Sequence, residues 1–240
     1  MEKLLKQFTH ARIGIGRAGT SIPIKESLEF KLAHAHARDA VYSALDADGL
    51  TSQLGVFNLP VIELRSQAKD RGQYLQRPDL GRQLDHSSIE NLESQLSGYD
   101  VVICIADGLS ALAIHENAVG LLQQLIPRLL QANLSVAPLC LVQQGRVAVA
   151  DDIGAALKAK LSIILIGERP GLSAADSLGV YLTYAPKRGL TDDSRNCISN
   201  IRMGGLDMDR AATKIFYLIQ ESFKRSLSGV MLKDNEGLLR

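Results

Sequence analysis

Polar segments follow the short apolar runs of the C-terminal half, and their residue types suit ligand binding. They are Asp107-Gly108-Leu109-Ser110, Gly145-Arg146-Val147, Gly167-Glu168-Arg169-Pro170-Gly171-Leu172 and Asn196-Cys197-Ile198-Ser199-Asn200. Ligands of open parallel sheets bind outside the carboxyl ends of the strands, so we expect these segments to form one site there. In the third, Gly167 and Gly171 allow close backbone approach and Pro170 stiffens the turn. Glu168 is thus predicted to be a fixed carboxylate, although a plain surface turn explains it too.

The glycine-rich segment Gly14-Ile15-Gly16-Arg17-Ala18-Gly19 matches the GxGxxG pattern, and Asp39 lies 20 residues after Gly19. In dinucleotide-binding proteins this loop opens a helix directly after a strand. Here Thr20-Ser21-Ile22-Pro23 separates the last glycine from the next helical pattern, and no second strand follows to carry Asp39. Both departures count against dinucleotide binding. An NAD-dependent oxidoreductase that uses Gly14 to Gly19 is kept only as the alternative hypothesis.

No pattern predicts a catalytic residue or a metal site in this chain. The five histidines have no carboxylate or thiol at metal-ligand spacing, and GxSxG, HExxH and GxxxxGK[ST] are absent. The three cysteines are too sparse for a disulfide framework. Cys104 and Cys140 lie in apolar runs and are predicted to be buried, whereas Cys197 has polar neighbours.

Composition excludes several classes of protein. The 240 residues include 27 Lys plus Arg and 26 Asp plus Glu, giving a net charge of +1, with 46% hydrophobic and 22% charged residues. The balance argues against nucleic-acid binding and against a polybasic membrane surface. No apolar run approaches the length of a membrane-spanning helix, and residues 1–8 do not resemble a signal peptide. We expect a cytoplasmic, globular protein.

Alternating apolar runs and helical patterns position the polar segments. Residues 100–106, 134–142, 161–166 and 178–184 are predicted strands; residues 112–130, 151–160 and 207–228 are predicted helices, with Pro127 as a kink or break and Gly229 as a C-terminal cap. Continuous apolar strands indicate a sheet covered on both faces. The fold class is α/β: a doubly wound, largely parallel, Rossmann-like sheet with a smaller, mainly helical N-terminal region.

The N-terminal region is less regular. Residues 23–45 are predicted to form a helix that starts at Pro23, and residues 61–64 a short strand. Residues 65–82 are predicted to form a polar loop, with five basic residues (Arg65, Lys69, Arg71, Arg77 and Arg82) against two acidic ones. This loop is either simply solvated or a surface that contacts a protein or an anion.

Six segments in collinear order resemble the small (light) subunit of ethanolamine ammonia-lyase. The matching segments are Gly16-Arg17-Ala18-Gly19, Tyr74-Leu75 with Arg77-Pro78-Asp79-Leu80-Gly81-Arg82, Asp107-Gly108-Leu109-Ser110, Gly145-Arg146-Val147, Gly167 to Leu172, and Cys197-Ile198-Ser199-Asn200-Ile201. They span nearly the whole chain. In the light of this resemblance, the first segment is the family's GRAG turn, not a nucleotide loop.

The resemblance implies an adenosylcobalamin-dependent lyase. In this family the cofactor lies between the small subunit and a large TIM-barrel subunit, within a higher hetero-oligomer. The large subunit binds ethanolamine, and an adenosyl radical starts the rearrangement that yields acetaldehyde and ammonia. Carried over by position, the cobalamin-binding residues are Val147, Glu168 and Cys197. Glu168 can accept an amide N–H of the corrin ring, and the other two side chains permit close contact.

The resemblance also implies that the cofactor keeps its own benzimidazole base, since the DxHxxG motif that replaces it elsewhere is absent. The change of sequence pattern from about Ser97 divides the chain into residues 1–96 and residues 97–240. The resemblance implies that the first part contacts the large subunit and that the second is an α/β domain that contacts cobalamin. Family members can carry a long N-terminal extension linked to packaging in a bacterial microcompartment. Here GRAG begins at Gly16, so we expect a cytoplasmic chain that only its large subunit would bring into such a compartment.

Overall fold

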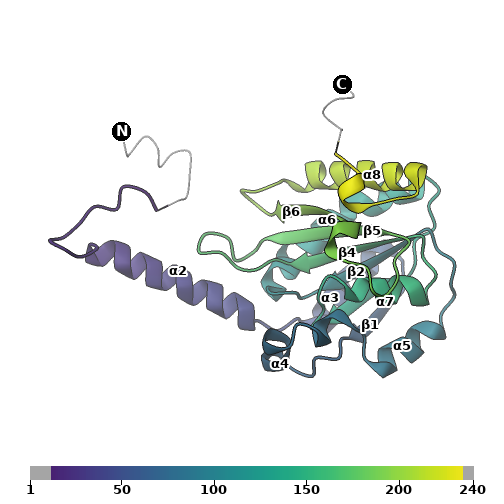
Figure 1. Ribbon diagram of the computed structural model, residues 1–240, viewed down its shortest axis with the longest axis horizontal. Coiled ribbons are helices and arrows are strands. Elements are labelled where there is room, and N and C mark those ends of the chain that lie inside the picture. The colour runs from purple at the N-terminus through teal and green to yellow at the C-terminus, as the bar shows by residue number, and fades with distance from the viewer. Residues whose placement is uncertain (1–11, 235–240) are drawn as a thin grey trace.

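A single six-stranded sheet organises the computed structural model, which describes residues 12–234 (Figure 1). Its order is β1-β3-β2-β4-β5-β6. The strands are β1 (Val61–Arg65), β2 (Val101–Ala106), β3 (Leu139–Gln143), β4 (Leu161–Gly167), β5 (Leu178–Tyr184) and β6 (Arg195–Ile201). The first four strands of this order pair in parallel, whereas β5 pairs antiparallel with both β4 and β6. The predicted α/β fold with a largely parallel sheet is confirmed.

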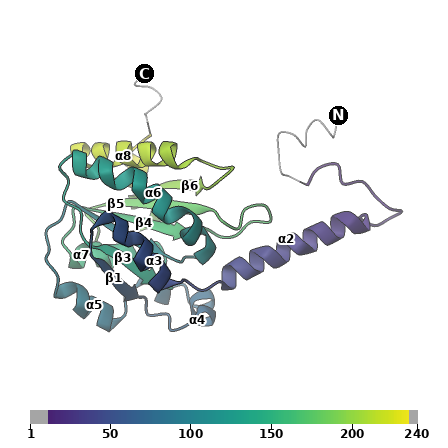
Figure 2. The same cartoon turned by 180° about the vertical axis from the view of Figure 1, so that it is seen from behind.

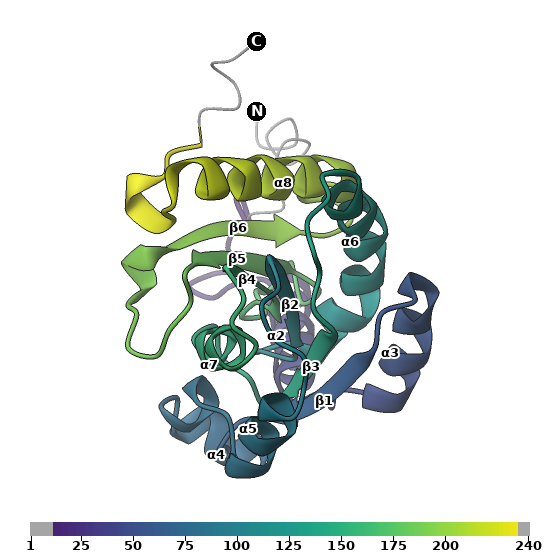
Figure 3. The same ribbon diagram turned by 90° about the vertical axis from the view of Figure 1, so that its right-hand side faces the viewer.

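Helices cover both faces of the sheet, as Figure 3 shows along the strands. One face packs against α3 (Ala47–Leu54), α6 (Ala111–Gln131) and α8 (Met208–Arg225), and the other against α5 (His86–Glu93) and α7 (Val149–Ala156). The remaining elements are α2 (Ile24–Tyr42), α4 (Arg71–Gln76) and the short turns η1 (Gly55–Phe57), η2 (Leu80–Arg82), η3 (Asp192–Ser194) and η4 (Gly229–Met231).

The central strands are buried on both sides, which explains their unbroken apolar sequence. In β2, Ile103 and Ile105 enter the core beneath α6 and α8, while Val102 and Cys104 enter the core beneath α7. This alternation follows from the two-residue repeat of a strand. Cys104 and Cys140 are both fully buried, as predicted, and they lie opposite each other on β2 and β3.

Several helices differ from the sequence prediction in their course or their ends. Helix α6 runs through Pro127 without a break. Helix α7 begins and ends earlier than the predicted residues 151–160. Helix α8 ends at Arg225 because Ser226 takes the left-handed conformation (φ 56°) that the prediction assigned to Gly229.

Helix α2 projects from the body of the molecule, as Figures 1 and 2 show from opposite sides. Before it, Ala18 and Ser21 close a tight turn through two mutual backbone hydrogen bonds of 2.8 and 3.2 Å. Backbone without strand structure precedes this turn from residue 12 onward. The glycine segment is therefore not a strand-to-helix phosphate loop, and the NAD-dependent alternative is not favoured.

Residues 65–82 do not form the predicted loop. Asp70 accepts a hydrogen bond from the Gln73 backbone N–H at 2.8 Å and so starts α4, and η2 follows. Strand β1 joins the main sheet by pairing with β3, although the division at residues 96 and 97 itself stays a prediction. Across residues 12–234, we find no helix with both the length and the apolar character needed to span a membrane.

Candidate functional site

Three of the four predicted polar segments meet at one edge of the sheet. They follow β3, β2 and β4, which are neighbours in the sheet, so their carboxyl ends lie side by side. The backbone N–H of Leu109 donates to Gly167 O at 2.9 Å, and that of Gly145 donates to Asp107 Oδ1 at 3.2 Å. These bonds join the three loops into one rigid platform.

Two glycines make this close approach possible. Gly108 has a φ of 56°, and a Cβ there would lie 2.3 Å from Gly167 O. A Cβ on Gly167 would lie 2.0 Å from Ser110 O. Neither position can hold a side chain without moving backbone, since such distances are far below van der Waals contact. Close packing of the two loops at the sheet edge therefore requires glycine at both positions.

A hollow of about 290 Å³ opens between these loops. Val147 enters it from the segment after β3 and Glu168 from the segment after β4. Two of the three predicted site residues therefore share one cavity. The other side chains around it include Tyr74, Arg146, Arg169 and Tyr181.

The Glu168 carboxylate is held by groups from two neighbouring segments. Ser177 Oγ donates to its Oε2 at 2.5 Å, and the Asn200 backbone N–H donates to the same atom at 3.2 Å. A Cβ on Gly179 would lie 3.0 Å from Oε1, so this glycine provides the room that the carboxylate occupies. Both bonds from the described residues end on Oε2, so Oε1 keeps its capacity to accept a hydrogen bond.

Tyr74 is the structural centre of the wall beside this hollow, and it is fully buried. The guanidinium of Arg71 lies 4.8 Å from its ring centroid and that of Arg146 lies 4.2 Å away. Its hydroxyl donates to Gly145 O at 3.2 Å. We call these three side chains the Tyr74 clamp. It joins α4 to the loop after β3 through cation–π contacts that gain strength in a desolvated site.

Asp107 couples this clamp to the other loops. Arg71 Nη1 lies 3.7 Å from Asp107 Oδ2 and donates to Gly108 O at 2.8 Å. Burial raises the pKa of Asp107 to about 6, against the lowering effect of Arg71 and the backbone N–H groups of Gln144 and Gly145. The carboxyl group therefore changes charge within the neutral-to-acidic range where few other carboxyl groups titrate.

Cys197 was predicted in a loop at a strand tip, and that placement is wrong. It lies within β6, opposite Tyr181 of β5. Its neighbour Ile198 enters the core beneath α8, so Cys197 faces the opposite side of the sheet, where its side chain is exposed. Desolvation by its surroundings raises the pKa of its thiol, while a hydrogen bond with Tyr181 acts to lower it. Tyr181 borders the hollow, so it links Cys197 to Val147 and Glu168.

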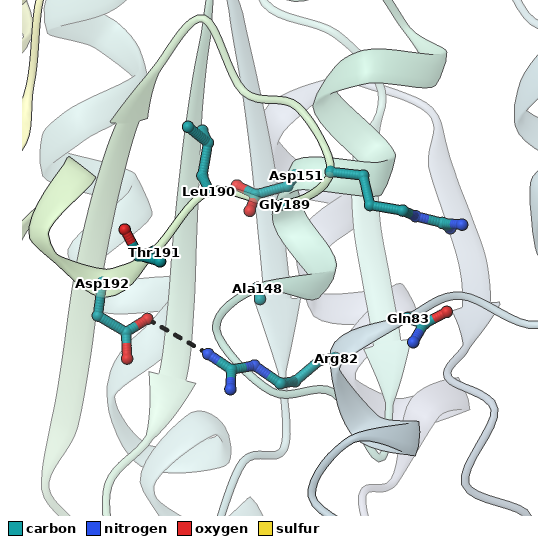
Figure 4. Close-up of a pocket in the computed structure, with 9 residues that line it drawn as sticks. Arg82, Gln83, Ala148, Asp151, Gly189, Leu190, Thr191 and Asp192 are labelled. Atoms are coloured by element: carbon teal, nitrogen blue, oxygen red, sulfur yellow. Dashed lines mark ion pairs between the residues drawn. The ribbon is translucent and has the colours of Figure 1, made fainter.

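Two further hollows continue the surface along α7. One of about 390 Å³ shares Val147 and Tyr181 with the first and extends to Arg82 and Asp192. The next, of about 440 Å³, is shown in Figure 4, where Arg82 and Asp192 meet across its mouth at 3.6 Å. Since adjacent hollows share residues, they form one uneven, open surface from Glu168 to Asp192.

A buried ion pair supports this surface from below. The side chains of Arg195 and Asp151 are 1% and 3% exposed, and both guanidinium–carboxylate distances are 2.7 Å. Arg195 also donates to Thr183 Oγ1 at 3.0 Å. Desolvation acts to lower the pKa of Arg195, but the bonds to Asp151 leave it raised. The pair fixes α7 against β5 and β6, and so fixes Val147 relative to Cys197.

Comparison with known proteins settles the family. A family model described as "Ethanolamine ammonia-lyase light chain (EutC)" matches residues 1–233. The chain belongs to this light-chain family. It is 52% identical over 234 residues to the ethanolamine ammonia-lyase small subunit of Pseudomonas putida (strain GB-1), covering 96% of this chain and 86% of the relative.

Two other relatives of the ethanolamine ammonia-lyase light-chain family give the same result. The small subunits of Pseudomonas aeruginosa (strain LESB58) and Pseudomonas fluorescens (strain SBW25) are each 51% identical over 234 residues. The alignment covers 96% of this chain in both cases, and 86% and 84% of the respective relatives. The resemblance inferred from six short segments is confirmed across the chain.

Sequence reasoning missed the aromatic residues of the site. Tyr181 lies in an apolar strand, and nothing in that strand distinguishes it from a core residue. Tyr74 lies in a segment predicted to be a loop, although the excess of arginines nearby was noted. Arg71 of that excess turns inward to the clamp, whereas Arg77 pairs with Asp79 at 2.7 Å and stays exposed.

Proposed function

We propose that this chain is the small subunit of an adenosylcobalamin-dependent ethanolamine ammonia-lyase, which converts ethanolamine to acetaldehyde and ammonia. In this proposal the chain binds and positions cobalamin, and a large TIM-barrel subunit holds the substrate in a hetero-oligomer. The observation that carries the proposal is the meeting of Val147 and Glu168 in one hollow. These are two of the three residues that the family resemblance assigns to the cofactor, and they come from separate loops.

The residues around the hollow fit a corrin ring bearing peripheral amides. Glu168 presents a charged acceptor for an amide N–H, and charged acceptors make the stronger hydrogen bonds. Arg146 Nε is buried without a hydrogen-bond partner among the described residues, and Arg146 lines the same hollow. A buried donor of this kind is costly unless a ligand oxygen satisfies it. Val147 supplies apolar contact between the two polar groups.

The open shape of the surface supports a site shared with another chain. The hollow at Glu168 measures about 290 Å³ and continues into its neighbours without being enclosed by this chain. A pocket that buries its ligand by itself covers most of the ligand surface. This chain therefore supplies one wall of the cofactor site, and the large subunit supplies the other.

When bound, adenosylcobalamin would supply the radical chemistry that begins the rearrangement. The residues of this chain would bind and orient the cofactor. Glu168 would accept a hydrogen bond from a peripheral amide of the corrin, and its own direction is fixed by Ser177 and Asn200. Tyr181 of β5 and its partner Cys197 of β6 would offer weakly polar contacts. In this proposal the cofactor retains its own benzimidazole base.

The test replaces Glu168 with Ala in the complex reconstituted with the large subunit. We expect cobalamin to bind at least about tenfold more weakly, because a charged hydrogen bond contributes about 1.5–3 kcal/mol. Cobalamin retained after gel filtration is measured by its visible absorbance across a titration. Glu90→Ala removes an exposed carboxylate on α5 and serves as the matched control.

One outcome tests the role of Glu168, and another tests the proposed function of the chain. Equal cobalamin affinity in Glu168→Ala and wild type would remove Glu168 from the site. The wild-type complex is expected to release ammonia from ethanolamine only when large subunit and adenosylcobalamin are both present. Full deamination by this chain alone would refute the proposed division of labour.

A further inference from the structure

The side chain of Glu168 lies against strand β5. A Cβ on Gly179 would stand 3.0 Å from its Oε1 and 3.1 Å from its Cγ. Gly179 and Tyr181 are two residues apart on β5, so they share one face of the sheet. Cys197 of β6 pairs with Tyr181 and shares that face too. The carboxylate is therefore held on the sheet face that carries Tyr181 and Cys197.

Ser177 holds this carboxylate from the residue just before β5. The last pair between β4 and β5 is Gly167 with Leu178, and beyond it the Glu168 backbone N–H donates to Ser177 O at 2.9 Å. The Ser177 hydroxyl donates in the other direction, to Glu168 Oε2 at 2.5 Å, a length typical of a hydroxyl bound to a charged acceptor. Ser177 is 7% exposed, so water competes little for this bond.

A β-bulge in β6 supplies the second donor. Two residues lie between Ile198 and Ile201 of β6, opposite Gly179 alone on β5. Asn200 is one of the two and has a left-handed backbone (φ 59°), and its N–H donates to Glu168 Oε2 at 3.2 Å. Bulges next to functional sites redirect single groups in this way. Here the redirected group is a backbone donor, and its acceptor is the carboxylate of Glu168.

The turn after β6 keeps Asn200 in this conformation. The Leu206 backbone N–H donates to Asn200 O at 2.7 Å, and Arg202 Nε donates to Asn200 Oδ1 at 2.9 Å. A Cβ on Gly205 would lie 2.3 Å from Asn200 O, so this turn requires a glycine there. The N–H that reaches Glu168 is thus fixed by the surrounding backbone.

Helix α6 fixes the loop that leads into Ser177. Ser110 Oγ donates to Ala175 O, and Asn117 Nδ2 donates to Asp176 O, each at 2.7 Å. These bonds and the backbone bond from Glu168 to Ser177 already close the connection between β4 and β5. The separate consequence of the Ser177 hydroxyl is therefore the direction of the carboxylate.

We propose that Ser177 is a positioning residue for cobalamin: its hydroxyl and the Asn200 N–H occupy Oε2 of Glu168, which leaves Oε1 to accept a peripheral amide of the corrin. This inference rests on the proposed function and deepens it. A glutamate side chain that becomes fixed only when a ligand binds loses rotational freedom, and that loss weakens binding. A carboxylate already fixed by Ser177 and Asn200 avoids this loss.

The experiment is a double-mutant cycle in the complex of this chain with the large subunit. Ser177→Ala removes the hydroxyl, Glu168→Ala removes the carboxylate, and a third form carries both changes. Each complex is titrated with cyanocobalamin, which has the same corrin amides as adenosylcobalamin, and the bound corrin is measured by visible absorbance after gel filtration. Ser173→Ala changes an exposed serine of the same loop and is the matched control. Urea unfolding checks that every variant folds like wild type.

We expect Ser177→Ala to weaken cyanocobalamin binding about three- to tenfold, which is the usual effect of having to fix one long side chain on binding. In the Glu168→Ala background the same change should alter the affinity by less than about twofold, because the carboxylate that Ser177 positions is gone. Ser177→Thr keeps the hydroxyl and should restore binding close to the wild-type affinity. Ser173→Ala should bind like wild type.

A second variant displaces the carboxylate without removing a donor. Gly179→Ala would place a methyl group whose three nearest atoms all belong to Glu168, at a position with no left-handed backbone to strain. It should weaken binding about threefold when Glu168 is present, because a displaced acceptor makes a poorer hydrogen bond. It should have no effect in the Glu168→Ala background. An equal loss in both backgrounds would contradict the inference.

The remaining outcomes separate this inference from the proposed function. If Ser177→Ala binds like wild type while Glu168→Ala binds more weakly, the inference is wrong and the proposed function stands. Equal losses from Ser177→Ala with and without Glu168 would assign the hydroxyl to the fold alone and refute the inference, as would a folded Ser177→Thr that binds like Ser177→Ala. Wild-type affinity in Glu168→Ala removes Glu168 from the site, and the inference falls with it. If the wild-type complex binds no cyanocobalamin, the proposed function itself is wrong.

Discussion

The buried pair of Arg195 and Asp151 gives the sharpest test of how the site is held. Both side chains are almost completely buried, and two bonds of 2.7 Å join them. Asp151 lies in the first turn of α7, and Arg195 is the first residue of β6. Replacing Asp151 with Ala leaves a buried guanidinium whose remaining partners are Thr183 Oγ1, Leu190 O and the exposed Asp192.

The expected loss follows from desolvation. Removing one member of a buried ion pair destabilises a protein by about 3–5 kcal/mol, because the other charge stays buried without compensation. Arg195→Met should cost a similar amount, since it leaves the Asp151 carboxylate buried. The double variant leaves no unpaired charge, so its loss should resemble that of one single variant. The coupling energy in a double-mutant cycle should therefore reach about 3 kcal/mol.

Urea unfolding of the purified chain measures each free energy of unfolding from the midpoint and slope. Arg225→Met, which breaks an exposed pair with Glu221, is the control and should change stability by less than about 1 kcal/mol. If the two single losses add within about 0.5 kcal/mol in the double variant, the two side chains are energetically independent. That result would refute the reasoning, including the inference that this pair fixes α7 against β6.

Two further predictions concern the wall of the hollow. Tyr74→Phe should lower stability by about 1–2 kcal/mol in urea unfolding, since Gly145 O loses its buried donor, while Tyr74→Leu should cost more by also removing both cation–π contacts. The pKa of Asp107 is raised from 3.8 to about 6, so its protonated form favours the folded state; that contribution is complete below about pH 4 and is lost as the pH rises through about 6. Wild type should therefore lose more stability than Asp107→Asn between pH 4 and pH 7, and equal slopes would contradict this assignment.

The sheet could be predicted because each central strand is recognisable from its own apolar sequence. Residues 161–166 are apolar without a break, and only a strand buried on both faces needs that pattern. The antiparallel direction of β5 could not be read in the same way. Direction depends on where the chain returns, and residues 168–177 connect β4 to β5 without the helix that a parallel crossover uses.

The site could be predicted only where it lies at strand ends. Val147 and Glu168 follow β3 and β4 directly, so their meeting follows from the order of neighbouring strands. Cys197 was assigned through family resemblance, and its position inside β6 depends on a strand whose sequence alternates too weakly to identify. Tyr74 reaches the hollow only because α4 packs over the loop after β3, a tertiary contact that no local pattern encodes.

The proposed sharing of the site with a cofactor and a second subunit would explain features that otherwise look like defects. Arg71 Nη2 and Arg146 Nε are buried without partners among the described residues, and both belong to the clamp beside the hollow. Helix α2 exposes apolar side chains at the same edge of the sheet. Unsatisfied donors and uncovered apolar surface each cost free energy in an isolated chain. These two donors and this apolar surface would be covered if a cofactor and a second subunit both bound at this edge, because binding would satisfy both at once.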